Sequence, residues 1–298
     1  MTRTACFIDR SLNQSDYKVR FLPQYDRGNG WYNILPSPPP GRKLDGEQAT
    51  DWLVIGAGFT GLSAGRRLAD CFPDDRIVIV EADRVGHGAS GRNAGFAIDL
   101  PFIREAHGNV EQGRRLLKIH RAGVNELDRL VKQYSIDCQW ANSGKYMVAV
   151  GSQACRDLMQ THEFLNKIGE PGELIDRNTI AGRLGTEFYQ KALYSPGTYL
   201  MNPAALTRGL AANLPANVDL YEDSPITDIR FGKTVVAKTT KGIIKSPRVI
   251  LATNGFTEAF GIMKNRIFNI MSFASLTPPL SEWADKGRDL LGNTPEWG

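Results

Sequence analysis

The sequence has few of the residues that hold small or secreted folds together. Its four cysteines, Cys6, Cys71, Cys138 and Cys155, are scattered over 298 residues without a C-x-x-C pair. That spacing argues against a zinc knuckle and against a disulfide scaffold. The four histidines show no H-x-x-x-H spacing either, so we predict no metal site.

Long apolar runs are absent as well. No stretch approaches the roughly 18 consecutive apolar residues that a membrane-spanning helix needs. The first residues, MTRTACFIDRSLNQSD, contain no apolar segment of the kind found in secretory signals. We therefore predict a protein without a membrane span, located in the reducing environment of the cytoplasm.

An excess of charge of one sign is also missing. The chain has 36 Lys and Arg against 32 Asp and Glu, a net charge of +4. The densest basic run, Arg114, Arg115, Lys118 and Arg121, has the spacing of a solvated helix face. Nucleic acid is therefore not an expected partner.

The sequence does contain enough apolar material for a large core. Hydrophobic residues make up 42% of the chain, and a chain of this length needs no covalent or metal cross-links to fold. At roughly 150 residues per domain, the length favours about two domains.

Residues 1–50 have little periodicity and include the run Pro36-Ser37-Pro38-Pro39-Pro40-Gly41. This composition predicts an extended, polyproline-like arm over the surface, anchored by Trp31 and Tyr32. From Asp51 onward the pattern changes. Short apolar runs at 52–55 and 77–80 flank a helical pattern at 61–70, which predicts a strand–helix–strand unit of an α/β fold with a parallel sheet.

The remaining elements follow from periodicity and turn residues. We predict helices at 110–134, 152–168 and 201–214, and a strand within 139–150 after a turn at Ser143-Gly144. Short strands near 218–221, 226–231, 235–239 and 249–252, separated by turn signals, suggest a meander.

A glycine motif lies between the first predicted strand and helix. Gly56, Gly58 and Gly61 form G-x-G-x-x-G, and Glu81 follows at the end of the second strand. Such glycines permit a tight turn, a close approach to pyrophosphate and close helix packing, while the acid accepts hydrogen bonds from ribose. This pattern predicts a dinucleotide site and disfavours NADP. The alternative is a turn of purely structural importance.

A second glycine-rich segment follows directly, from Ala82 to Phe96. It carries a guanidinium, an amide and a hydroxyl, which suit a second phosphate and a ribityl chain. We prefer this interpretation to a flexible loop, and it makes an NAD-linked dehydrogenase less favoured.

The strings V-I-G-A-G-F-T-G-L-S and E-A-D-R-V-G-H-G-A-S-G-R-N-A-G-F resemble FAD-dependent amine and amino-acid oxidoreductases of the D-amino-acid oxidase/glycine oxidase type. The similarity is greatest to the γ-glutamylputrescine oxidase-like branch. It extends over about residues 30–290 and includes M-N-P-A-A-L at 201–206, S-P-I at 224–226 and V-I-L-A-T-N-G at 249–255.

The resemblance implies a Rossmann-like FAD-binding domain built from separated segments, with an inserted α+β substrate domain. It implies an arm at 1–50, an FAD-binding domain at 51–110 and 200–260, and a helical linker with a partial substrate domain at 111–199 and 261–298. The cofactor-binding residues it implies are Gly56, Gly58, Phe59, Thr60, Gly61, Glu81, Ala82, Gly88, Ala89, Ser90, Arg92, Asn93, Ala94, Gly95, Ile226, Ala252, Thr253 and Asn254.

By this resemblance, Ile226 would hold the adenine through its backbone, and residues 252–254 would pass beside the pyrophosphate. Ser90, Arg92, Asn93 and Gly95 would run along the ribityl chain toward the isoalloxazine ring. The implied reaction is hydride transfer from the carbon next to an amine to flavin N5, followed by imine hydrolysis and flavin reoxidation by oxygen or another acceptor. No catalytic base is identified. Some relatives attach FAD covalently, but for His87 we expect packing or hydrogen bonding, and so a non-covalent FAD.

Chains of this family continue beyond the length of this one, so we interpret the sequence as truncated or split. The alternative to a complete amine oxidase is therefore a flavin-binding but catalytically incomplete fragment, which pairs with a missing C-terminal half or a partner chain.

Overall fold

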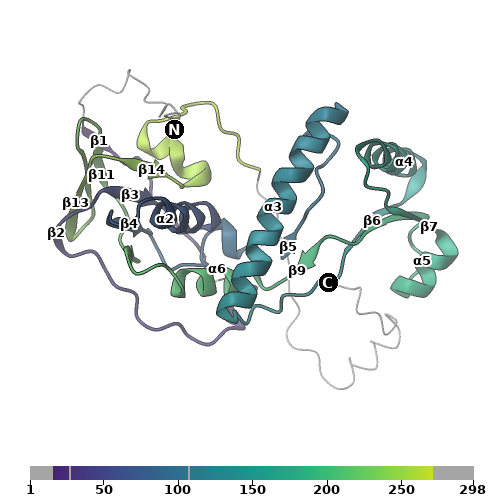
Figure 1. The fold of residues 1–298 in the computed structure, drawn as a ribbon, viewed down its shortest axis with the longest axis horizontal. Coiled ribbons are helices and arrows are strands. Elements are labelled where there is room, and N and C mark those ends of the chain that lie inside the picture. The colour runs from purple at the N-terminus through teal and green to yellow at the C-terminus, as the bar shows by residue number, and fades with distance from the viewer. Residues whose placement is uncertain (1–15, 27, 107, 271–298) are drawn as a thin grey trace. The chain divides into compact units, whose positions relative to one another are not determined.

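The computed structural model describes residues 16–26, 28–106 and 108–270, which are drawn in colour in Figure 1. The chain divides into two compact units. Of the described residues, 16–93 and 203–270 belong to the first unit and 94–202 to the second.

The first unit contains a parallel sheet in the order β10-β4-β3-β14. Its strands are β3 (Trp52–Ile55), β4 (Ile77–Val80), β10 (Val218–Tyr221) and β14 (Val249–Leu251), and all neighbouring pairs are parallel. Helix α2 (Phe59–Cys71) connects β3 to β4. The predicted strand–helix–strand unit is thus confirmed.

A second sheet of the first unit has the order β1-β11-β12-β13-β2. Its strands are β1 (Asp16–Lys18), β2 (Gly46–Ala49), β11 (Asp228–Arg230), β12 (Val235–Lys238) and β13 (Gly242–Ser246). Only the β13–β2 pair is parallel.

This topology corrects two expectations. The strands at 218–221 and 249–251 belong to the parallel sheet, so the meander consists of β11, β12 and β13. Turn residues between short strands signal a change of direction but do not identify the neighbour in the sheet. Residues 1–50 also supply β1, β2 and the short helix α1 (Gly30–Asn33). The parts of this segment in β1 and β2 are therefore paired in a sheet and are not a surface arm.

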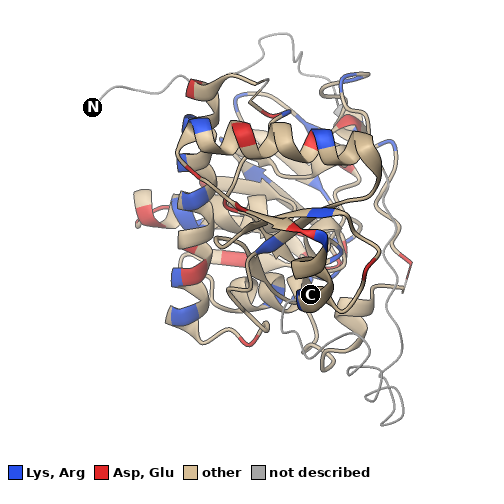
Figure 2. Cartoon of the chain, turned by 90° about the vertical axis from the view of Figure 1, so that its right-hand side faces the viewer, with Lys and Arg blue, Asp and Glu red and all other residues tan. Residues whose placement is uncertain are grey.

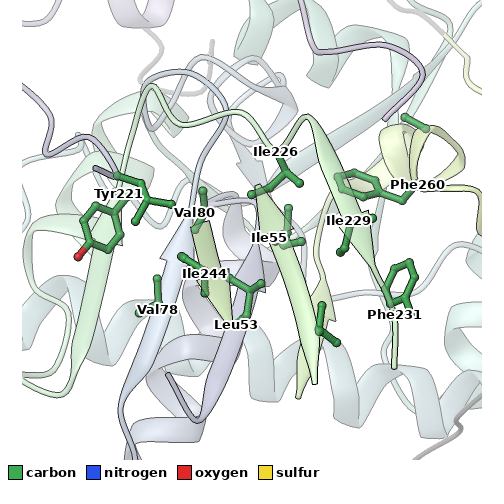
Figure 3. Close-up of a cluster of buried hydrophobic side chains, with 14 residues drawn as sticks. Leu53, Ile55, Val78, Val80, Tyr221, Ile226, Ile229, Phe231, Ile244 and Phe260 are labelled. Carbon is green, nitrogen blue, oxygen red and sulfur yellow. The ribbon is translucent and has the colours of Figure 1, made fainter. Parts of the chain in front are cut away.

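The two sheets of the first unit pack around a shared hydrophobic core (Figure 3). Leu53 and Ile55 of β3 lie in this cluster together with Ile229 of β11 and Ile244 of β13. The opposite face of the parallel sheet is covered by α2, where a Cβ placed on Gly65 would lie 2.7 Å from Cδ1 of Ile79. Because β3 and β4 are covered on both faces, these two strands are apolar throughout.

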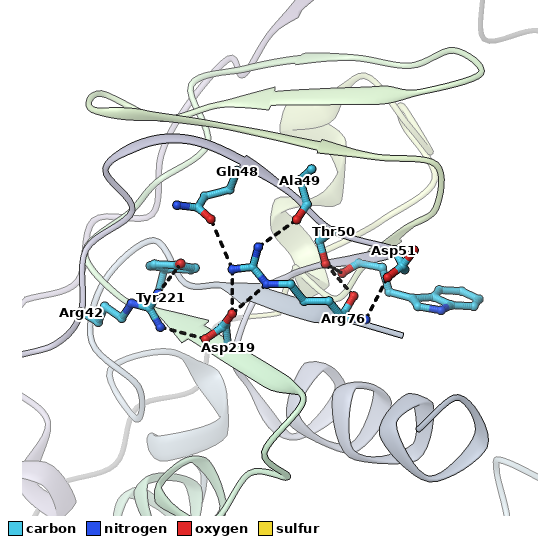
Figure 4. A network of polar contacts seen from close by, with 9 residues as sticks. Arg42, Gln48, Ala49, Thr50, Asp51, Arg76, Asp219 and Tyr221 are labelled. Atoms are coloured by element: carbon cyan, nitrogen blue, oxygen red, sulfur yellow. Dashed lines mark hydrogen bonds and ion pairs between the residues drawn. The ribbon is translucent and has the colours of Figure 1, made fainter. Parts of the chain in front are cut away.

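A polar network links the two sheets at the start of β4 (Figure 4). Arg76 donates to Asp219 Oδ2 at 2.8 and 3.0 Å, to the Ala49 carbonyl at 2.9 Å and to Gln48 Oε1 at 3.2 Å. Arg42 donates to Asp219 Oδ1 at 2.8 Å. Burial opposes ionisation of Asp219, but the hydrogen bonds from Arg76 and Arg42 outweigh it and lower its pKa.

Helix α6 and two 3-10 turns complete the first unit. They are α6 (Pro203–Ala212), η1 (Ala89–Gly91) and η2 (Asn254–Phe260). The helix predicted at 201–214 begins at Pro203, because proline at the first helical position loses no intrahelical hydrogen bond.

The second unit contains helices on a three-stranded antiparallel sheet of order β6-β8-β7, and a separate β5-β9 pair. Its elements are β5 (Phe96–Ala97), α3 (Val110–Tyr134), β6 (Lys145–Ala149), α4 (Gly151–Ile168), β7 (Glu173–Asp176), α5 (Arg177–Leu184), β8 (Lys191–Ser195) and β9 (Tyr199–Leu200). The predicted helices at 110–134 and 152–168 are confirmed. The sequence did not predict β5, β7, α5, β8 and β9 of this unit, nor β13 of the first unit.

Among the described residues, no helix is both long and apolar enough to cross a membrane. The same residues include no group of three or more His, Cys, Asp or Glu side chains that could hold a metal ion. Lys and Arg segments are interspersed with Asp and Glu segments along the ribbon in Figure 2. On α3, for example, Arg129 pairs with Glu126 and Lys132 with Asp128.

Candidate functional site

The glycine motif forms the turn between β3 and α2. Gly56 has a φ of +103°, and a Cβ there would lie 2.6 Å from the Ala252 carbonyl oxygen. A Cβ on Gly61 would overlap the Gly56 carbonyl oxygen. Larger residues would therefore separate the helix from both β3 and the segment after β14.

The N-terminus of α2 has no side-chain cap, because its N-cap residue is Gly58. The Ala57 N–H donates to Glu81 Oε2 at 2.7 Å, and the Phe59 N–H donates to Ser90 Oγ at 3.0 Å. Within the described part of the chain, the N–H groups of Gly58, Thr60 and Gly61 have no acceptor. Unpaired N–H groups and the helix dipole make this end favourable for an anion.

Glu81 follows β4 and lies beside this helix end. Its carboxylate also accepts from the Asp83 N–H at 3.2 Å. Burial raises the pKa of Glu81, and the hydrogen bonds from Ala57, Asp83 and Ala82 act in the opposite direction. The site therefore combines a hydrogen-bond acceptor with unpaired N–H donors.

In the loop after Glu81, side chains hold the loop itself. Arg92 donates to the His87 carbonyl at 2.6 Å and to the Asp26 carboxylate at 2.8 Å. Asn93 donates to the Ser90 carbonyl at 2.8 Å. Gly88 is the N-cap of η1, which begins at Ala89. The polar groups of Arg92 and Asn93 thus stabilise the loop conformation.

The N-terminal segment contributes to this loop, as the aromatic pair suggested. Trp31 Nε1 donates to the Asn93 carbonyl at 3.0 Å. The ring of Tyr32 packs against that of His87 with centroids 4.2 Å apart, and His87 Nδ1 lies 3.2 Å from Asp83 Oδ1. His87 therefore has the packing and polar contacts expected for it.

Tyr25 also lies near the site, although it was not predicted from the sequence. A Cβ on Gly88 would lie 3.2 Å from its hydroxyl. Burial, followed by the charges of Glu81 and Asp83, raises the pKa of Tyr25 to about 12. The hydroxyl therefore stays protonated at neutral pH. Residues 1–50 have no periodicity that would have indicated this placement.

Ile226, predicted at the adenine, and residues 252–254, predicted at the pyrophosphate, lie at the same edge of the parallel sheet as the Gly56–Gly61 motif. The Ser224 N–H donates to the Glu81 carbonyl at 2.9 Å. Two residues on, Ile226 is 3% exposed, and its N–H and C=O have no partner among the described residues. The Ala252 N–H donates to the Ile55 carbonyl at 2.8 Å, which aligns Thr253 and Asn254 after β14.

Ala94 and Gly95 belong to the second unit, so the structure does not place them relative to the other predicted site residues. The Gly95 carbonyl accepts from the Met201 N–H at 2.9 Å within that unit. The remaining predicted site residues lie in the first unit, around the carboxyl ends of β3, β4 and β14.

Known proteins share both the fold and the sequence pattern. The model of the FAD dependent oxidoreductase (DAO) family matches residues 51–295. The chain therefore belongs to the family of FAD-dependent oxidoreductases.

Two curated relatives show how much of such a protein is present. The chain is 30% identical to the probable oxidoreductase OrdL of Haemophilus influenzae, over 78% of this chain and 56% of the relative. It is 31% identical to the gamma-glutamylputrescine oxidoreductase of Escherichia coli, over 69% of this chain and 49% of the relative. The chain thus spans about half the length of the curated relatives it matches.

Solved structures confirm the fold class. Glycine oxidase from Geobacillus kaustophilus aligns with a TM-score of 0.58 and 24% identity, over 72% of this chain and 58% of that one. L-amino acid deaminase from Proteus vulgaris, in a form lacking its specific insertion, aligns with a TM-score of 0.61 and 18% identity, over 82% and 61%. The chain has the mixed α/β fold of these proteins.

Replacing Glu81 by Gln should weaken FAD binding. A hydrogen bond to a charged acceptor contributes about 1.5–3 kcal/mol, so the dissociation constant should rise roughly ten- to over a hundredfold. Fluorescence titration with FAD measures the change. Glu47→Gln, on the exposed strand β2 of the same unit, is the matched control and should bind normally. An unchanged dissociation constant for Glu81→Gln would show that this carboxylate does not contact the ribose.

Replacing Gly58 by Val should give a folded protein that does not retain FAD. The new side chain would point to Ser90, whose Oγ lies 2.7 Å from a Cβ at this position, and would block the approach to the helix N-terminus. Gly232→Val, at an exposed turn of the same unit, should keep the flavin. Circular dichroism and the flavin absorbance of the purified variants test this. Full flavin occupancy in Gly58→Val contradicts the placement of the phosphates.

Proposed function

We propose that this chain binds FAD without a covalent bond and is part of an enzyme that oxidises the C–N bond of an amine or amino acid. The observation that carries the proposal is the uncapped N-terminus of α2 beside Glu81. The unpaired N–H groups of Gly58, Thr60 and Gly61 are suited to a pyrophosphate. The acceptor at Glu81 is suited to ribose hydroxyls.

These residues fit the adenosine-diphosphate half of FAD. Pyrophosphate would lie at the α2 N-terminus with Phe59, Thr60 and the segment 252–254 beside it. Ribose would lie at Glu81 and Ala82, and adenine at the backbone of Ile226, whose polar groups are unpaired among the described residues. The carboxylate of Glu81 would repel a 2′-phosphate, which disfavours NADP.

For the flavin half we propose the loop residues Gly88, Ala89, Ser90, Arg92 and Asn93, followed by Ala94 and Gly95. The backbone of this loop would line the ribityl chain, because the side chains of Arg92 and Asn93 already donate to Asp26, His87 and Ser90. When bound, flavin supplies a hydride acceptor for the carbon next to the amine nitrogen. His87 would support the loop through Tyr32 and Asp83, without a covalent link.

The class of substrate is supported by the relatives. They include a gamma-glutamylputrescine oxidoreductase, a glycine oxidase and an L-amino acid deaminase. Each of these names refers to a compound with a C–N bond next to an oxidisable carbon. A second candidate is a flavin-binding chain without amine-oxidising activity of its own.

Ligand titration and spectroscopy test both candidates. FAD and ADP should bind and compete, whereas FMN should bind far more weakly because it lacks the adenosine half that the described residues fit. After acid precipitation, all yellow colour should stay in the supernatant. The FAD-loaded chain is then mixed without oxygen with a panel of amines and amino acids. Flavin absorption bands that do not bleach rapidly support the second candidate. Rapid bleaching of these bands by an amine supports the first candidate, an amine-oxidising enzyme. A protein that binds neither FAD nor ADP excludes both.

A further inference from the structure

The second unit contains a cavity of about 330 Å³ that the cofactor site does not use. Its lining comes from the segment after β5, from α3, from the segment before β6, from the turn between α4 and β7, and from the ends of β8 and β9 with the turn between them. This volume lies at the lower end of the range for small-molecule sites, about 300–1,000 Å³. All lining residues belong to the second unit.

Asp99 is the buried charged residue of this cavity. Its side chain is 7% exposed, and its Oδ2 accepts from Arg121 Nε at a long distance of 3.3 Å. Its Oδ1 is buried and has no hydrogen-bond partner among the described residues. The carboxylate packs against Gly197, where any Cβ would overlap it. A buried carboxylate oxygen is stabilised by a hydrogen-bond donor, so Oδ1 is suited to accept a hydrogen bond from a bound group.

Arg121 does not supply that donor, because Glu170 engages its guanidinium. The pair is bidentate, with Nη1 and Nη2 donating to the two Glu170 oxygens at 2.7 and 2.5 Å. The hydrogen bonds from Arg121 to Glu170 raise the Arg121 pKa, and burial opposes this. Arg121 therefore remains positive and directed to Glu170.

Lys145 does not supply the donor either. Its ammonium lies 4.7 Å from the centre of the Phe102 ring and does not line the cavity. Burial lowers its pKa, whereas the charge of Asp99 acts in the opposite direction. Among the lining residues, two carboxylates and one guanidinium leave a net charge of −1.

We propose that this cavity binds the primary ammonium group of a small alkylamine, which donates to Asp99 Oδ1. An ammonium has three N–H donors and a charge that balances the lining. Asn142, Ser195 and Tyr199 also line the cavity and offer further acceptors for the remaining N–H groups. The cavity has room for a short alkyl chain behind the nitrogen.

This nitrogen is not one from which oxidation would start. An amine must be neutral to lose hydride from its neighbouring carbon, whereas a nearby carboxylate stabilises the ammonium form. The cavity would therefore hold a cationic group that does not react. The proposal does not depend on flavin binding or on amine oxidation, so its failure leaves the proposed function intact.

Calorimetric titration of the full 298-residue chain with three ligands of similar shape tests the proposal. We expect n-butylamine to bind, n-butanol to bind at least about tenfold more weakly, and n-butyrate not to bind, since only the first provides a charged donor. Binding of n-butylamine should weaken as ionic strength rises. Equal binding of amine and alcohol, or no binding of the amine, overturns the proposal, as does displacement of the amine by K⁺ at equal concentration.

A substitution locates the site. Asp99→Asn keeps the shape but removes the charge, and it should weaken n-butylamine binding at least about tenfold. Asp157→Asn, on the exposed face of α4, is the matched control and should bind as the unaltered chain does. Normal binding by Asp99→Asn overturns the assignment to this cavity. If circular dichroism shows that Asp99→Asn does not fold, the comparison of the three ligands decides by itself.

Discussion

The close approach of the Gly56–Gly61 turn to the segment after β14 is the constraint on which the site depends. Backbone atoms of Gly56 and Ala252 lie so near that a Cβ would not fit. This approach sets the N-terminus of α2 at the carboxyl ends of β3 and β14. Because the N-cap is glycine, no capping side chain occupies the N–H donors at this end. Glu81 and Ser90 hold the neighbouring N–H groups and so fix the shape of the turn.

The N-terminal segment stabilises the glycine-rich loop that follows Glu81. Trp31 and Asp26 bind its backbone and its Arg92, while Asn29 donates to the carbonyls of Gly86 and Gly91. These contacts bring residues that are about sixty positions apart in the sequence into one surface. A loop held in this way needs little reordering when a ligand binds, which reduces the entropic cost of binding.

The core of the nucleotide fold could be predicted because its signals are local. Apolar runs at 52–55 and 77–80 are buried on both faces of the sheet, and the glycine motif lies between them. Sheet neighbours could not be predicted, since the pairing of β10 with β4 and of β14 with β3 depends on contacts between distant segments. The segments β7, α5 and β8 were missed because their short polar and apolar runs have no clear period. Asp176, the N-cap of α5, was the available signal.

The candidate site could likewise be predicted from the sequence only where its signals are local. The motif glycines and Glu81 were recognisable from spacing, whereas Tyr25 and the structural use of Arg92 depend on the path of residues 16–35.

We propose above all that the unpaired N–H groups at the start of α2 bind the pyrophosphate of an adenine dinucleotide. Two-dimensional ¹H–¹⁵N NMR of the chain with added ADP tests it most directly. We expect the amide signals of Gly58, Thr60 and Gly61 to shift strongly and to saturate together. Saturable binding of ADP that leaves these three signals unchanged would contradict it.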